Sequence, residues 1–292
     1  MNTITDSNDV DNTVENIKTD KTVLSAITPG TVRTISGATS LGQVFRDTLT
    51  MAWRHFIKMF RNPAEFTDVT IQPILFTLMF VFLFGGAIAG DVKSYLPTMI
   101  PGLLAMSVLT TASVTGTKMR EDMDKGVFDR FKSLPMARIA PLSGALLADT
   151  LRYFIATTLT FATGFVIGYR PESGMRGVVV AGLLIIFTTW ALSWIFALLG
   201  VIMPSASSVQ GLSMMILMPL TFVSNAIVPV ASMPSWLQAF VKVNPITHVV
   251  SAMRDLTMNG DWGVDVVWTL VISIIIVVVF APLTVRAYMR KV

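Results

Sequence analysis

The sequence contains no cysteine, and its only two histidines, His55 and His248, lie far apart in a chain of 292 residues. The absence of cysteine excludes disulfides, thiolate chemistry and cysteine-ligated metals, and the scarcity of histidine argues against a histidine-rich metal site. Charged residues make up only 14% of the chain, whereas a soluble domain usually carries about 25%. Together with 53% hydrophobic residues and a mean hydropathy of +0.66, this deficit excludes an ordinary cytosolic enzyme and a disordered chain.

Motifs for nucleotide binding and hydrolysis are absent as well. No Gly-Lys dipeptide occurs, so the chain lacks a phosphate-binding loop of the form G-x-x-x-x-G-K-[ST]. Neither H-E-x-x-H nor G-x-S-x-G is present. We therefore expect no catalytic site and no metal or cofactor bound by this chain, and any energy source must come from a partner. The net charge of +4 is mild, and no nucleic-acid partner is expected.

Residues 1–40 are rich in Asn, Thr, Asp and Ser and contain few large apolar side chains. Such a segment buries too little surface to offset the entropy lost on ordering. It also lacks the apolar stretch of a secretory signal. The composition predicts a disordered cytoplasmic tail over 1–40, followed by a membrane domain over 41–292.

Uncharged stretches of about 20 residues recur after residue 68, for example between Asp68 and Asp91. The stretch between Arg176 and Lys242 is long enough for two crossings, and Pro and Ser break it at 203–208. A helix rises about 1.5 Å per residue, and the hydrocarbon core is about 30 Å thick. The pattern predicts an all-α integral membrane protein with six transmembrane helices, near 69–89, 97–117, 142–169, 177–203, 209–229 and 264–286.

The distribution of lysine and arginine sets the orientation of these spans. If the N-terminus is cytoplasmic, the inside segments carry thirteen basic residues and the outside loops carry five. Cytoplasmic loops are normally the basic ones. We therefore expect both termini in the cytoplasm, in the plasma membrane of a bacterium.

Apolar residues recur every three or four positions over 41–61, and basic residues fall mostly between them. The apolar set includes Phe45, Trp53 and Phe56. A period of 3.6 with basic residues and a tryptophan is typical of a helix in the headgroup plane. It is either a lever that links a cytoplasmic partner to the first span or a passive anchor, and Asn62-Pro63 should end it.

The longest cytoplasmic loop, 118–140, is dense in charge but also contains Val127, Phe128, Phe131 and Leu134. A loop that is only solvated has no reason to expose these side chains. They form either a docking element for a soluble partner or a group that dips into the membrane interface, and the sequence favours docking.

The outside segment 228–263 is too apolar for a free loop and too interrupted by proline for a span. Ser235–Val243 and Pro245–Met258 could each form a short helix, which predicts re-entrant or interfacial helices.

Isolated polar residues in the predicted spans and in the outer segment favour a structural role over a functional one. Asp149 and Arg152 are spaced to pair on one helix face. His248 is expected to be a hydrogen-bonded structural residue, and Asn225 to bond across helices. The spans lack a chain of acidic residues, which argues against an ion-coupled transporter.

Several segments, taken in order and spacing, resemble the membrane permeases of type-2 ABC exporters, in the daunorubicin and multidrug-resistance-like subfamily. The resemblance covers residues 41–292 and leaves the tail outside. The segments are GVFDRFKSLP (126–135), LLADTLR (146–152), ALSW (191–194), VQGL (209–212), PLTFVSNA (219–226), MPSWLQ (233–238) and NPITHVV (244–250).

The resemblance implies two such permease subunits, identical or different, and two cytoplasmic ATPase subunits that bind ATP and Mg²⁺. It implies a connecting helix over 41–60, carrying Phe45, Trp53 and Phe56. It also implies short re-entrant outer helices before the last span. The implied coupling helix, which contacts the ATPase, comprises Val127, Phe128, Asp129, Arg130 and Phe131.

The expected function is export of a hydrophobic or amphipathic compound through a path between subunits, within membrane lipid. Apolar residues of the second and fifth spans are candidates to line it, namely Met106, Leu109, Met215, Met218 and Phe222. An export permease for lipid or lipid-linked glycan remains an alternative. So do an ATP-independent transporter or channel and a regulatory membrane subunit.

Overall fold

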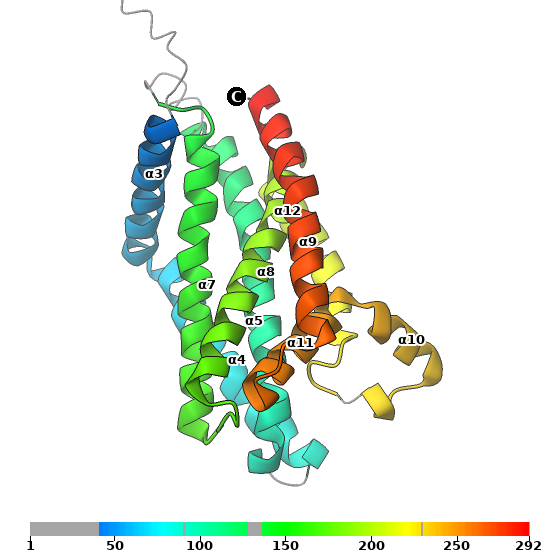
Figure 1. Ribbon diagram of the computed structural model, residues 1–292. Helices are drawn as coiled ribbons and strands as arrows, with labels where there is room; N and C mark the ends of the chain where they lie inside the picture. The colour runs from blue at the N-terminus through cyan, green and yellow to red at the C-terminus, as the bar shows by residue number, and fades with distance from the viewer. Residues whose placement is uncertain (1–40, 90–91, 128–135, 229, 292) are drawn as a thin grey trace, which may run out of the picture. The chain divides into compact units, whose positions relative to one another are not determined.

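The computed structural model describes residues 41–89, 92–127, 136–228 and 230–291. The predicted tail over 1–40 and the predicted coupling residues Phe128, Asp129, Arg130 and Phe131 lie outside these ranges. The described residues contain helices and turns but no strand, which confirms the all-helical prediction (Figure 1).

Five helices of the described chain are long and apolar enough to cross a membrane. They overlap five of the six predicted spans, and in chain order they are α4 (Pro63–Ala89), α5 (Val92–Asp124), α7 (Ala140–Ile167), α8 (Gly174–Ile202) and α12 (Val264–Lys291).

The sixth prediction, a span over 209–229, corresponds to a shorter helix. Helix α9 (Ala206–Phe222) has 17 residues, or about 25 Å at 1.5 Å per residue. Asn244 explains its end, because the side-chain Nδ2 donates to the carbonyls of Leu220 and Val223 at 2.7 and 2.6 Å. These carbonyls lie in the last turn, where no intrahelical donor is available.

Helix α3 (Leu41–Arg61) precedes the first long helix and packs against α7. As predicted, it ends at Asn62-Pro63. The side-chain Oδ1 of Asn62 accepts from the backbone N–H of Ala64 at 3.2 Å. Asn62 therefore caps α4, and Pro63 occupies the first helical position, where a missing N–H costs nothing.

Helix α5 is the buried axis of the bundle and packs against α4, α7, α8, α9 and α11 (Pro245–Arg254). Within an apolar stretch of 18 residues in α5, 83% of the residues are buried inside the chain, whereas the corresponding share in α12 is 17%. The apolar surface of α12 therefore faces outward, where lipid or another subunit can cover it.

Two glycines let α5 and α8 cross closely. A Cβ at Gly116 would lie 2.2 Å from the Phe196 carbonyl oxygen, and one at Gly200 would lie 2.4 Å from the Gly116 carbonyl oxygen. Both obstacles are backbone atoms, so a larger side chain at either position forces the helices apart.

The segment before α12 forms η1 (Val230–Ser232), α10 (Ser235–Val243), α11 and a π-helical turn, η2 (Asp255–Asn259). The two short helices expected over 235–243 and 245–258 are therefore present. This segment contacts α5 near Thr98, whereas α3 contacts α5 near Asp122. The two lie at opposite ends of α5 (Figure 1).

We predict that Gly116→Ala and Gly200→Ala each lower the apparent melting temperature of the purified protein in detergent, because the added methyl groups separate α5 from α8. The control is Gly211→Ala on α9, where a Cβ meets nothing within 4 Å. This change should leave the melting temperature unchanged or raise it, since alanine favours a helix interior by about 0.5–1 kcal/mol. Equal melting temperatures for all three variants would contradict the close crossing.

Candidate functional site

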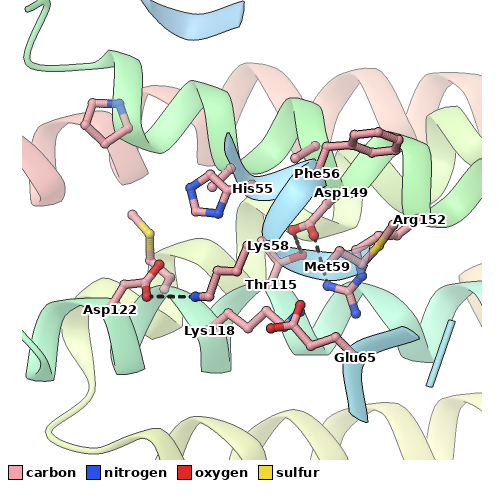
Figure 2. A pocket seen from close by; sticks show the side chains of 14 residues that line it. His55, Phe56, Lys58, Met59, Glu65, Thr115, Lys118, Asp122, Asp149 and Arg152 are labelled. Atoms are coloured by element: carbon pink, nitrogen blue, oxygen red, sulfur yellow. Dashed lines mark hydrogen bonds and ion pairs between the residues drawn. The ribbon is translucent and has the colours of Figure 1, made fainter. Parts of the chain in front are cut away.

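Helices α3, α4, α5 and α7 bring six charged side chains together near the Asp124 end of α5 (Figure 2). We refer to them as the charged cluster. Its members are Lys58 of α3, Glu65 of α4, Lys118 and Asp122 of α5, and Asp149 and Arg152 of α7.

The predicted pairing of Asp149 with Arg152 is confirmed. An Nη1 of Arg152 donates to Oδ1 of Asp149 at 2.9 Å, and the side chains are only 5% (Arg152) and 10% (Asp149) exposed. The other carboxylate oxygen, Oδ2, accepts from the Thr115 hydroxyl at 2.6 Å, and that hydroxyl lies 3.1 Å from the Tyr153 hydroxyl. The pair therefore also fixes α7 against α5, which the sequence alone did not indicate.

Two further ion pairs connect α5 to the first two helices. Lys118 pairs with Glu65 of α4, and Lys58 of α3 pairs with Asp122 at 3.4 Å. The Lys58 side chain is 48% exposed, so its pair contributes little to stability and serves mainly to set position. Three cations thus face three carboxylates, which keeps the buried charges compensated.

His55 of α3 borders the same site. Burial lowers the pKa of His55 from its ordinary value of 6.5, although the nearby carboxylates of Asp122 and Asp149 act in the opposite direction. The ring is therefore neutral at neutral pH, and the cluster keeps its balance of charges.

A cavity of about 40 Å³ lies within the site. Within the described chain, the buried Nε of Arg152 has no hydrogen-bond partner. A water molecule needs about 10–15 Å³ of such space, so the cavity has room for one that would accept from this nitrogen.

This arrangement of charges is suited to holding helices in position. Each carboxylate accepts from a cation, so none is poised as a general base. Among the described residues, no group of three or more His, Asp or Glu side chains could hold a metal ion. What the charged cluster can do is keep α4, α5 and α7 in register, since a displacement that separates the pairs leaves buried charge without a partner. Helix α3 adds only the more exposed pair between Lys58 and Asp122.

The predicted connecting-helix residues all lie on α3. Phe45 and Trp53 are 69% and 62% exposed, and Phe56 is half-buried beside the cluster. The Asp47 carboxylate accepts from the backbone N–H of Ala137 at 3.0 Å. Helix α3 therefore binds Asp122 before the segment 128–135 and Ala137 after it, which the sequence pattern did not indicate.

Of the predicted coupling residues, only Val127 lies within the described chain, at the end of one range and half-buried.

The predicted path residues fall into two groups. Met215, Met218 and Phe222 on α9 are 71%, 57% and 53% exposed, whereas Met106 and Leu109 on α5 are 2% and 0% exposed in the core. The structure does not bring the two groups to one surface.

At the opposite end of α5, Arg254 connects three segments that the sequence did not link. Its guanidinium donates to the carbonyls of Thr98, Asn225 and Ala226 at distances of 2.7–3.3 Å. Burial lowers its pKa to about 10, so the charge persists at neutral pH.

Two hydrogen bonds expected in this region are confirmed. Asn225 donates from Nδ2 to the Ser251 hydroxyl of α11 at 2.9 Å, and His248 hydrogen-bonds to Asp265 through Nδ1 at 2.6 Å.

The buried pair gives a direct test of the charged cluster. Asp149→Leu should lower the melting temperature strongly, because an unpaired buried guanidinium costs about 3–5 kcal/mol. The double variant Asp149→Leu/Arg152→Leu should recover much of the loss, since a buried pair can often be replaced by apolar residues. Glu121→Leu is the control, because its pair with Lys125 is largely exposed and contributes less than about 0.5 kcal/mol. A double variant no more stable than Asp149→Leu would contradict the assignment.

Comparison with known proteins places this fold and site in a family. Residues 46–258 match the family described as ABC-2 type transporter. The chain is 43% identical over 245 residues to the "Daunorubicin resistance ABC transporter permease protein DrrB1" of Streptomyces coeruleorubidus, covering 84% of this chain and 86% of that protein.

More distant relatives agree. The "Probable doxorubicin resistance ABC transporter permease protein DrrC" of Mycobacterium tuberculosis is 24% identical over 240 residues, covering 77% of this chain and 82% of that protein. The "Putative transport permease ycf38" of Porphyra purpurea is 23% identical over 225 residues, covering 76% of this chain and 77% of that protein. With five helices able to span a membrane, the chain is a multi-pass membrane protein and belongs to the ABC-2 type transporter family, as a permease subunit.

Proposed function

We propose that this permease exports a hydrophobic or amphipathic, drug-like compound, using ATP hydrolysed by a separate subunit. The observation that carries the proposal is the 43% identity, over 84% of the chain, to a permease named for daunorubicin resistance. The doxorubicin-resistance name of a second relative points to the same class of cargo. These names favour a drug over a lipid or lipid-linked glycan.

In this proposal the transporter contains two permease subunits, identical or different, and two ATPase subunits that bind ATP and Mg²⁺. The permease lies in a bacterial plasma membrane with both termini in the cytoplasm. The excess of basic residues in the segments placed inside supports that orientation. Helix α9 serves as the sixth, short span, and tilt or local thinning of the bilayer accommodates its length.

The ATPase docks on Val127, Phe128, Asp129, Arg130 and Phe131, which form the coupling helix of the proposal. The contacts of α3 support this placement, because α3 binds the chain on both sides of the docking segment, at Asp122 and at Ala137. A movement of the segment would therefore reach α3, and through the charged cluster it would reach α4, α5 and α7.

The cargo path lies where α9 of one permease faces its partner. Three exposed apolar side chains, Met215, Met218 and Phe222, support this location, and methionine suits a surface that accommodates varied apolar ligands. Met106 and Leu109, which are buried here, would line the path only in another state of the transport cycle.

Substitutions in the docking segment test the proposed ATPase contact. Phe128→Asp and Phe131→Asp should each abolish co-purification of the P-loop ATPase expressed with the permease, because a carboxylate does not enter an apolar socket without a partner. Phe128→Leu and Phe131→Leu keep the apolar character and should retain it. Melting temperature and expression level serve as folding controls. Undiminished co-purification of the aspartate variants would refute the contact.

A further inference from the structure

Helix α3 carries a second apolar face that no described part of the chain covers. One face packs on α7 and buries Met51, Ala52 and Met59. A different face leaves Phe45, Leu49, Trp53 and Phe60 between 48% and 69% exposed. An amphipathic helix with such a face and flanking basic residues is suited to the membrane interface.

A groove of about 600 Å³ runs between this face and α7. Its lining is apolar except for Thr50, and the residues are Leu49, Thr50, Ala52, Trp53 and Phe56 of α3 with Leu147, Ala148 and Leu151 of α7. The Thr50 hydroxyl already donates to the Arg46 carbonyl at 2.9 Å. The groove therefore suits a hydrocarbon ligand and falls within the usual range of ligand-site volumes.

The groove lies beside the charged cluster, because Phe56 and Ala148 line both the groove and the cavity of the cluster. Helix α3 continues past this level to Lys58 and Arg61, which are exposed. A level that carries exposed cations is the boundary between headgroups and acyl chains, not the hydrocarbon interior. In the orientation of the proposed function, on which this inference rests, the groove therefore faces the cytoplasmic leaflet at its interface, where one acyl chain can enter it.

The basic residues of α3 favour a lipid with an anionic headgroup. The helix carries four basic residues, of which Arg46, Arg54 and Arg61 are exposed. Its one carboxylate, that of Asp47, accepts the Ala137 N–H. Arg46 does not line the groove itself, but it lies one helical turn before Leu49 and Thr50, which do. A basic amphipathic helix attracts anionic lipid.

We propose that the groove between α3 and α7 binds one acyl chain of an anionic phospholipid, with the phosphate held at Arg46. The bound lipid fills the space between the two helices and steadies α3.

Native mass spectrometry of the purified permease, without ATPase or nucleotide, tests this site. The probes are phosphatidylglycerol and phosphatidylcholine with identical acyl chains. The wild-type chain should retain one phosphatidylglycerol with at least a fivefold preference, about the contribution of one surface arginine.

Two matched pairs of variants locate the lipid. Leu147→Trp adds an indole ring to the wall of the groove and should lower retention, whereas Leu83→Trp, at an exposed leucine of α4, should not. Arg46→Gln should remove the preference for phosphatidylglycerol, whereas Arg176→Gln, at an exposed arginine of α8, should preserve it. Melting curves confirm that each variant is folded.

Equal retention by Leu147→Trp and wild type, or no preference between the two lipids, would overturn the proposal. So would a loss of dimer mass in Leu147→Trp with lipid retention unchanged, because the groove would then be a contact between copies. These outcomes involve neither transport nor ATPase binding, so they are distinguishable from a failure of the proposed function.

Discussion

Three cations and three carboxylates meet where α3, α4, α5 and α7 converge, and the position of each helix depends on the others through them. The most buried pair, Asp149 with Arg152, is held from a second helix by Thr115. Separating buried charges exposes each to an environment that cannot solvate it. Helices α4, α5 and α7 therefore resist independent movement at this end, and α3 adds the more exposed pair of Lys58 with Asp122.

The rest of the architecture would carry a displacement of these helices across the bundle. Helix α5 is rigidly seated, because its close crossing with α8 at Gly116 and Gly200 leaves no room for adjustment. Its opposite end is bound by Arg254, which also holds the carbonyls that follow α9. A single buried helix thus joins the charged cluster to the segment before α12. This geometry supports a permease in which a movement of the helices around the charged cluster also moves the segment before α12.

Sequence reasoning succeeded where the signal is local. Charge-free stretches located five long helices, Asn62-Pro63 marked a helix boundary, and the spacing of Asp149 and Arg152 predicted their pairing. It failed where the determinant lies far along the chain. The end of α9 depends on Asn244, more than twenty residues later, and Thr115 meets Asp149 only because α5 packs on α7.

Apolar spans pose a further problem for sequence reasoning, because a residue that faces lipid and a residue in the core look alike. Met106 and Met215 are the same residue type in similar surroundings of sequence, yet one is 2% and the other 71% exposed. The periodicity of α5 does not distinguish a buried face from an exposed face, since 83% of its 18-residue apolar stretch is buried. Which residues could line a path therefore emerged only from the packing.

We expect an ATPase partner to supply the energy for transport by this permease. The most direct measurement compares sealed vesicles that contain the permease alone with vesicles that contain the permease and its P-loop ATPase. A fluorescent amphipathic drug and ATP with Mg²⁺ are supplied to both. The drug should accumulate against its gradient only in the vesicles with the ATPase. Uphill accumulation by the permease alone would contradict this expectation.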